Sequence, residues 1–448
     1  MARFSFICAA LVVCAFPHVA TAAEAVHYHE RITTQQSRSV NTMATVMTVS
    51  AAELTSAGFQ ANDDVLILFF GVFAVASTNE VEWELTYGGA GSVITNAAEP
   101  RIDPGAGGIE RAVSWMGRVN LGGTINDIDL DWLTGTNGTN VFLEKAEIVV
   151  IRLSDFGVEN TDWFWDKSTT AVANTTTYSS TNRASVTIDL TSQPVEDWVA
   201  FAFVQTAMDA VNINSEVRLM LDGSLVAGDW SEEGESATEE LVRVFFDLAP
   251  SVSAASHTWS IETRDDTATA ANDHRESALL VFRRAKWPDL YVHEPGTVSV
   301  ANATDVQAAT ITDSFSTGQD ALIFGQGELN IDTLSQNTFM WVRQGGSTIL
   351  EPVIDDGSAL SNQRSYDATD ELHTHILSFA TLTSGAQDLD LFVHHTGGAT
   401  ENMVLTKFIV WGMEQATPVV TSTVTRSIRL FQDFLIKFLN GKILIHQQ

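Results

Sequence analysis

One stretch of sequence recurs three times in this chain: an aspartate followed at once by a run of apolar residues. The three copies begin at Asp64, Asp197 and Asp320. A second apolar run follows each copy, and it is opened by Glu144, Glu276 or Glu401; the intervals from aspartate to glutamate are 80, 79 and 81 residues by subtraction. Equal spacing of two apolar runs predicts three copies of one structural unit.

The segments between these runs have the pattern of short strands. Glycine-rich turns separate them, and residues 126–132 alternate strictly between polar and apolar. Frequent turns between alternating strands indicate antiparallel sheets. We therefore expect an all-β fold of three tandem antiparallel β-sandwich, jelly-roll-like units. The predicted parts are 1–22 (signal peptide), 23–154 (unit 1), 155–288 (linker and unit 2), 289–414 (unit 3) and 415–448 (linker and amphipathic tail).

The charge balance limits the choice of partner. A formal net charge of −32 argues against nucleic acid and against anionic membrane as partners of the body, because phosphate binding needs clustered lysine and arginine. Solubility explains the acidity, and divalent cation binding is the alternative. No other cofactor is expected.

The first 22 residues have the pattern of a secretory signal. Arg3 precedes an apolar run over 4–16, and small residues at 20–22 provide a cleavage site after Ala22. Both cysteines, Cys8 and Cys14, lie within this segment. We expect a secreted, extracellular protein without disulfides; a lipid anchor on Cys14 is the alternative.

Three tryptophans are candidate binding residues. Trp163 and Trp165 lie two residues apart, so on a strand they would face the same way and could stack on a sugar or a protein partner. Trp230 lies in the stretch 229–235, which we interpret as an acidic loop. The alternative for the pair is that it covers an open end of the neighbouring sandwich.

Two histidines in the third unit could bind zinc. His373 and His375 alternate along a strand, so both rings would lie on one face. They align, however, with Val242 and Val244 of the second unit. The alternative is that they occupy partly buried strand positions.

The C-terminal tail differs from the body. Ile428, Phe431, Leu435 and Phe438 recur at helical spacing, and the tail carries a net positive charge. These features predict an amphipathic helix that docks on its own sandwiches or on another copy. A membrane surface is the alternative.

The repeated unit resembles tandem jelly-roll modules of the tumour-necrosis-factor and C1q-like type, which also occur in phage tail-fibre and other virion proteins. The resemblance rests on strand order and on segments such as 218–224 and 256–261. It implies a structural or assembly role, and no ligand residues are carried over from it.

The motifs of several enzyme classes are absent from the sequence. It contains no Gly-x-Ser-x-Gly, no His-Glu-x-x-His and no phosphate-binding glycine loop with lysine. We therefore expect no enzyme. Two functions are predicted instead: a secreted or surface structural protein, virion or fibre components included, or a carbohydrate-binding protein that uses exposed tryptophans and acidic loops.

Overall fold

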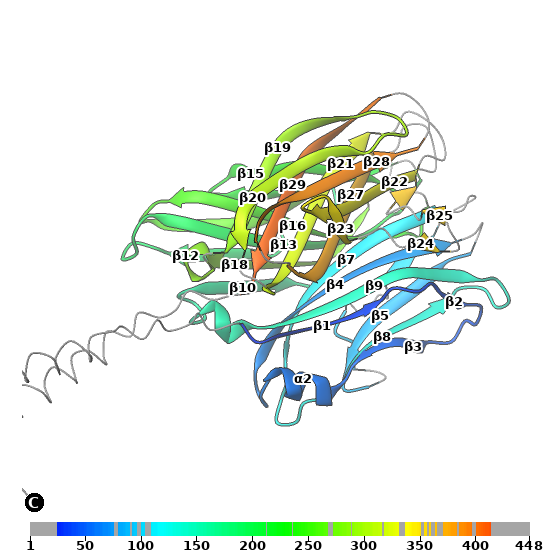
Figure 1. The fold of residues 1–448 in the computed structure, drawn as a ribbon, viewed down its shortest axis with the longest axis horizontal. Helices are drawn as coiled ribbons and strands as arrows, with labels where there is room; N and C mark the ends of the chain where they lie inside the picture. The colour runs from blue at the N-terminus through cyan, green and yellow to red at the C-terminus, as the bar shows by residue number, and fades with distance from the viewer. Residues whose placement is uncertain are drawn as a thin grey trace, which may run out of the picture. The chain divides into compact units, whose positions relative to one another are not determined.

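The structure is a computed structural model. It describes residues 25–413 except for positions 76–78, 90–91, 96–99, 104–108, 212, 235, 268–271, 288, 316–317, 331–336, 351–353, 356–357, 360–362, 365–370, 383–384 and 397–399. The signal segment and the tail predicted from sequence lie outside these residues. Nearly all described elements are strands (Figure 1).

The first unit contains two sheets, β1-β9-β4-β7 and β3-β8-β5-β6. Its strands are β1 (His27–Ile32), β2 (Gln36–Arg38, which extends the first sheet), β3 (Ala44–Val49), β4 (Asp64–Val75), β5 (Val81–Tyr87), β6 (Arg101–Ile102), β7 (Ile109–Asn120), β8 (Ile128–Thr134) and β9 (Val141–Arg152). Helix α2 (Ala51–Ala57) follows β3, and a capping box between Ser50 and Glu53 starts it.

The second unit begins after the 3-10 helix η1 (Leu153–Phe156) and contains the sheets β10-β18-β13-β16 and β12-β17-β14-β15. Its strands are β10 (Trp163–Ser168), β11 (Val172–Ala173, paired with β18), β12 (Ser185–Asp189), β13 (Glu196–Ala207), β14 (Asn214–Leu221), β15 (Ser224–Glu233), β16 (Glu240–Val252), β17 (Ser256–Asp265) and β18 (Asp273–Arg283).

The third unit begins after η2 (Arg284–Lys286) and contains the sheets β19-β29-β21-β27 and β20-β28-β22-β23. Its strands are β19 (Leu290–Val300), β20 (Val306–Phe315), β21 (Asp320–Asn330), β22 (Asn337–Gln344), β23 (Ser347–Leu350), β27 (Glu371–Thr381), β28 (Gly385–His395) and β29 (Glu401–Gly412). The short strands β24 (Ile354–Asp355), β25 (Ser358–Ala359) and β26 (Gln363–Arg364) lie between β23 and β27.

All three units have the same strand order. When the eight strands on the sheet paths of a unit are numbered in chain order, the two sheets read 1-8-3-6 and 2-7-4-5 in every unit. Two four-stranded antiparallel sheets connected in this way form a jelly roll. We call the units rolls 1, 2 and 3, the 1-8-3-6 sheet of each roll its junction sheet, and the 2-7-4-5 sheet its outer sheet.

The repeated aspartates occupy equivalent places, as the sequence predicts. Asp64 and Asp320 are the first residues of β4 and β21, and Asp197 is the second residue of β13. Each of these strands is third in its roll and lies in the middle of its junction sheet. The predicted all-β fold of three tandem antiparallel sandwiches is therefore confirmed.

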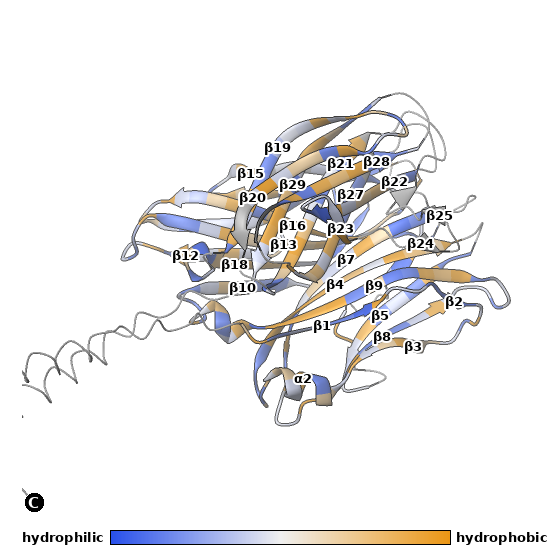
Figure 2. Ribbon diagram, in the orientation of Figure 1, coloured by the Kyte–Doolittle hydropathy of each residue, from blue (hydrophilic) through white to orange (hydrophobic). Residues whose placement is uncertain are grey.

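The apolar runs arise because the junction sheets are buried on both faces. Along β13, Val199 and Phe201 belong to an apolar cluster that includes residues of all three rolls, whereas Trp198 and Ala200 belong to the core of roll 2 alone. The same alternation occurs in β21. A strand buried on both faces has no polar side, which explains why β4 and the middle of β13 are mostly hydrophobic in Figure 2.

The described residues between 25 and 413 lie in one compact unit. The three rolls therefore share a single body rather than standing apart on linkers. Among the described residues, no helix has the length and apolar character needed to span a membrane.

Candidate functional site

The sixth strand of each roll packs against the next roll, and the three contacts close a ring. β16 of roll 2 packs against β6 and β7 of roll 1, β7 packs against β26 and β27 of roll 3, and β27 packs against β15 of roll 2. Head-to-tail contacts that close on themselves have cyclic symmetry. One chain thus reproduces the arrangement of a threefold ring, in which β7, β16 and β27 each contact a neighbouring roll.

Near the starts of the central strands, the junction is aromatic. Trp411 of roll 3 stacks on Phe282 of roll 2, with 5.2 Å between ring centroids. Phe156, at the end of roll 1, meets Phe282 edge-on at 4.9 Å and Trp411 at 5.4 Å. Rings from all three rolls therefore seal this end of the junction, and such pairs contribute about 0.5–1.5 kcal/mol each beyond their burial.

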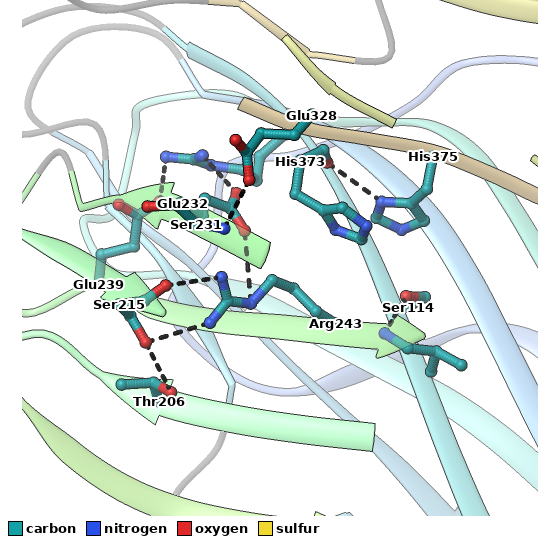
Figure 3. Close-up of polar contacts among 12 residues, drawn as sticks. Ser114, Thr206, Ser215, Ser231, Glu232, Glu239, Arg243, Glu328, His373 and His375 are labelled. Atoms are coloured by element: carbon teal, nitrogen blue, oxygen red, sulfur yellow. Dashed lines mark hydrogen bonds and ion pairs between the residues drawn. The ribbon is translucent and has the colours of Figure 1, made fainter. Parts of the chain in front are cut away.

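Further along the same strands, the junction becomes polar (Figure 3). Arg111 of roll 1 donates a 2.7 Å hydrogen bond to Glu232 of roll 2 and lies 3.0 Å from Glu239. Arg243 lies 3.6 Å from the other oxygen of Glu232. We call the following residues the polar cluster: Arg111, Ser215, Ser231, Glu232, Glu239, Arg243, Glu328, His373 and His375.

The charges of the polar cluster are almost completely removed from water. The exposed fractions of Arg111, Glu232, Glu239 and Arg243 are 3%, 2%, 0% and 1%. Burial lowers the pKa of the Arg243 guanidinium, and the nearby Glu232 carboxylate opposes this shift. Because an unpaired buried charge costs several kcal/mol, these pairs bind the rolls together only while every partner stays in place.

Backbone groups extend the contacts to the third roll. The Ser231 N–H of roll 2 donates to the Glu328 carboxylate of roll 3 at 2.7 Å. The Val244 N–H of roll 2 donates to the Ser114 hydroxyl of roll 1 at 2.8 Å. The polar cluster and its surroundings therefore contain residues of all three rolls.

His373 and His375 lie inside this cluster, on β27. Glu328 pairs with His373 and Gln205 with Val242 in their sheets, and both partners lie eight residues after the repeated aspartate. The predicted alignment of the histidines with Val242 and Val244 is thus confirmed, and both are buried strand residues. Among the described residues, no three His, Cys, Asp or Glu side chains are placed to hold a metal ion, so the zinc prediction gains no third ligand.

The candidate tryptophans are covered rather than displayed. Trp163 is 3% exposed, and its indole N–H donates to the Gly157 carbonyl at 3.2 Å. Trp165 is half-buried against the shared apolar cluster. Trp230 is 1% exposed within the core of roll 2. This corrects the sugar-platform prediction for Trp163 and Trp230, because neither ring offers an open face.

The stretch interpreted as an acidic loop is largely a strand. Residues 229–233 end β15, and Glu232 points into the junction rather than into water. Sequence reasoning missed the polar cluster because its partners, Arg111 and Glu232, are 121 residues apart. One local signal was present: Arg243 interrupts the apolar strand 241–246 and has no exposed face there.

Two further polar contacts hold roll 3 in place. Arg31 and Glu147 of roll 1 form two 3.0 Å hydrogen bonds, and Glu147 also accepts from the Phe379 N–H and the Ser378 hydroxyl of roll 3. Lys407 of roll 3 donates to Asp247 of roll 2 at 2.5 Å. Burial raises the pKa of Asp247 to about 6, although Lys407 acts in the opposite direction.

One constellation outside the junction has the composition of a catalytic triad. In roll 2, His257 Nδ1 lies 2.6 Å from an Asp222 oxygen, and its Nε2 lies 3.2 Å from the Ser253 hydroxyl. Nε2 lies closer, at 2.9 Å, to the Ser253 carbonyl oxygen. A carbonyl can only accept a hydrogen bond, so Nε2 donates and cannot serve as a general base there. The imidazole instead ties the loop between β16 and β17 to the turn after β14.

Comparisons with known proteins show no family membership. No family model and no curated protein matches the chain. Similar solved structures include a Paenibacillus xanthan lyase (12% identity, 66% of this chain and 30% of that longer chain, TM-score 0.19). They also include the major capsid protein P2 from bacteriophage PM2 (12% identity, 57% of this chain and 99% of that chain, TM-score 0.23). A third is a tandem CBM22 domain from Paenibacillus barcinonensis (9% identity, 55% of this chain and 93% of that chain, TM-score 0.17). With scores this low, the jelly-roll assignment rests on strand order alone.

Proposed function

We propose that this protein is a structural component of an extracellular or surface assembly, in which one chain supplies a rigid block of three jelly rolls. The observation that carries the proposal is the burial of all three junction sheets on both faces. The apolar faces of the junction sheets and the buried charges of the polar cluster hold the rolls against each other. A block whose units are fixed against each other in this way suits a structural component.

The other features of the chain agree with this role. The basic tail sequence differs in charge from the acidic body. Virion and fibre components, and the tumour-necrosis-factor or C1q-like relationship suggested by the sequence, are specific forms of the same proposal. Export through the predicted signal segment would place the protein outside the cell.

Self-association of the exported protein tests the proposal. We would express the full chain, recover it from the medium or the cell surface, and sequence its N-terminus, which should begin at Ala23. Light scattering and electron microscopy should show assemblies larger than one chain. Truncation before residue 415 should reduce assembly if the tail docks on protein. A full-length protein that stays monomeric at every concentration would overturn the structural role. Flotation of the protein with liposomes would show that the tail binds a membrane instead of protein.

The outer sheet of roll 3 favours carbohydrate binding as a second candidate. Phe392 on β28 is half-buried and stacks at 5.6 Å on Trp341, its partner on β22, which is only 7% exposed; Phe392 is therefore the ring that a sugar could reach. Arg343 lies 4.2 Å from the Phe392 ring centroid, next to Asp390 on the adjacent strand. Aromatic rings flanked by charged donors and acceptors suit sugars. The equivalent pairs in rolls 1 and 2 are charged.

A glycan array with the full chain tests this second candidate. Binding that is lost in Phe392→Ala but kept in Phe164→Ala, a half-buried aromatic of the roll 2 core, would support it. Absence of binding by a folded protein to all plant, algal and bacterial glycans would remove it.

A further inference from the structure

His373 of roll 3 lies among aromatic rings supplied by roll 2. Its ring centroid is 5.1 Å from that of Trp230 on β15 and 5.0 Å from that of Phe245 on β16. It is 1% exposed, and neither ring nitrogen has a hydrogen-bond partner among the described residues. His373 thus fills the contact between the two rolls as an uncharged ring.

His375 continues this contact toward roll 1. Its ring stacks on His373 at 5.0 Å and meets Phe70 of β4 edge-on at 5.5 Å. His375, Ser114 of roll 1 and Val244 of roll 2 occupy equivalent positions. Each pairs with the residue that lies six positions after the repeated aspartate of its own roll. Rolls 1 and 2 therefore use residues that carry no titratable group where roll 3 uses an imidazole.

We propose that the His373–His375 pair is an acid-sensitive switch: when the pH falls, protonation of these two rings releases roll 3 from its contacts with rolls 1 and 2. Two adjacent imidazoles in an aromatic site cannot both carry charge without water, so the protonated pair favours an opened junction. The neutral pair favours the closed one.

The surrounding charges determine how strongly the closed junction resists protonation. The charged groups on the elements packed around the pair include Arg111 on β7, Lys145 and Glu147 on β9, Glu232 on β15, Glu239 before β16, Arg243 on β16 and Glu328 on β21. The carboxylates of Glu232 and Glu239 are already paired with Arg111 and Arg243. Arg243 also opposes a positive charge on either histidine.

Linkage gives the direction and the pH window. Burial lowers the pKa of His375 to about 4 and that of His373 well below its ordinary 6.5. An opened junction would restore ordinary values, so it binds more protons than the closed one between pH 6.5 and about 4. Stability of the junction therefore falls as the pH falls through this window, about tenfold per pH unit for each proton taken up.

Asp247 acts in the opposite direction. Its pKa is raised to about 6 in the closed junction from an ordinary 3.8, so opening releases a proton and acid favours closure by about tenfold per pH unit below pH 6. From pH 7.5 to 5.0, two histidines favour opening about 1000-fold and Asp247 opposes this about tenfold. The net increase in the opening constant is therefore roughly 100-fold.

Hydrogen exchange of the full chain at pH 7.5 and pH 5.0, corrected for the intrinsic rate at each pH, tests the switch. Amides of β27 and β15, which meet at this contact, should lose about 100-fold in protection at pH 5.0. Amides of β14 and β17 inside the outer sheet of roll 2 should keep theirs. Unchanged protection of β27 in the wild-type protein would overturn the proposal.

A matched variant takes its residues from roll 2. His373→Val with His375→Val introduces the residues found at 242 and 244 and should abolish the acid-induced loss, leaving only the closing effect of Asp247. His394→Val, on the outer face of roll 3 beside Asp305, should behave as wild type. If the double variant does not melt cooperatively at pH 7.5, His375→Val alone replaces it. Equal loss of protection in wild type and a folded valine variant would also overturn the proposal.

Discussion

The backbone N–H of Phe379 in roll 3 donates a 2.7 Å hydrogen bond to the carboxylate of Glu147 in roll 1. Glu147 is fully buried and binds Arg31 through both of its oxygens. A backbone group of one roll thus depends on a charged side chain of another. Such contacts distinguish a single block from three tethered domains.

Replacing this carboxylate should loosen the attachment of roll 3. Glu147→Gln keeps the shape of the side chain but removes its charge and one acceptor oxygen, so the free energy of unfolding should fall by about 1–3 kcal/mol. Glu159→Gln is the control, because Glu159 pairs with Arg118 at an exposed site and should change stability by less than about 1 kcal/mol. Equal losses of unfolding free energy for the two variants in urea denaturation would show that the contact of Glu147 with roll 3 adds no more stability than an exposed ion pair.

Removing the cation of the polar cluster should be more damaging. Arg111→Leu removes the buried guanidinium that lies 2.7 Å from Glu232 and 3.0 Å from Glu239, which should cost about 3–5 kcal/mol. Arg101→Leu breaks a partly exposed pair with Glu82 and should cost about 1 kcal/mol or less. Because the stranded carboxylates can take up protons, melting temperatures of Arg111→Leu should recover partly toward pH 5. No recovery would contradict a charge-based loss.

Glu240 should make stability depend on pH near neutrality. Burial raises its pKa from 4.5 to about 7, while its hydrogen bond with Gln205 opposes the shift. A raised carboxyl pKa contributes stability that is complete below pH 4.5 and is lost as the pH rises through 7. Glu240→Gln should therefore flatten the stability profile between pH 5 and 8, with a gain of up to about 3 kcal/mol at pH 8. An unchanged profile in chemical denaturation would refute this assignment.

The triad-like constellation of roll 2 should be structural. His257→Ala removes the bonds that tie the β16–β17 loop to the β14–β15 turn and should destabilise the protein by about 1–2 kcal/mol. Ser253→Ala should have little effect, because its carbonyl rather than its hydroxyl makes the closer contact. Neither the wild type nor the variants should react with a fluorophosphonate probe. If the wild type is labelled and Ser253→Ala is not, Ser253 is a nucleophile and the structural assignment of this constellation is wrong.

How much of this structure could be predicted follows from the range of each signal. The equivalent positions of Asp64, Asp197 and Asp320 were predictable because a central strand that is buried on both faces requires a continuous run of apolar residues, which is visible in the sequence. The alignment of His373 with Val242 was predictable for the same reason. The ring of contacts between rolls was not, because Arg111 and Glu232 become neighbours only after three sheets have formed.

The misplaced tryptophans have a related cause. Trp230 is followed by Ser231 and two glutamates, a composition typical of exposed loops, yet Glu232 is buried because arginines of two rolls neutralise it. Charge in a short segment therefore predicted exposure wrongly. The tail residues Ile428 and Phe431 lie outside the described residues, so their docking remains a prediction.

Scanning calorimetry of the full chain at pH 7.5 tests the central claim that three jelly rolls form one cooperative block. If the junction sheets are held together as described, the rolls should unfold in one transition, with a calorimetric enthalpy equal to the van't Hoff enthalpy. Three separable transitions, or a calorimetric enthalpy about three times the van't Hoff value, would show that the rolls unfold independently and would contradict the account.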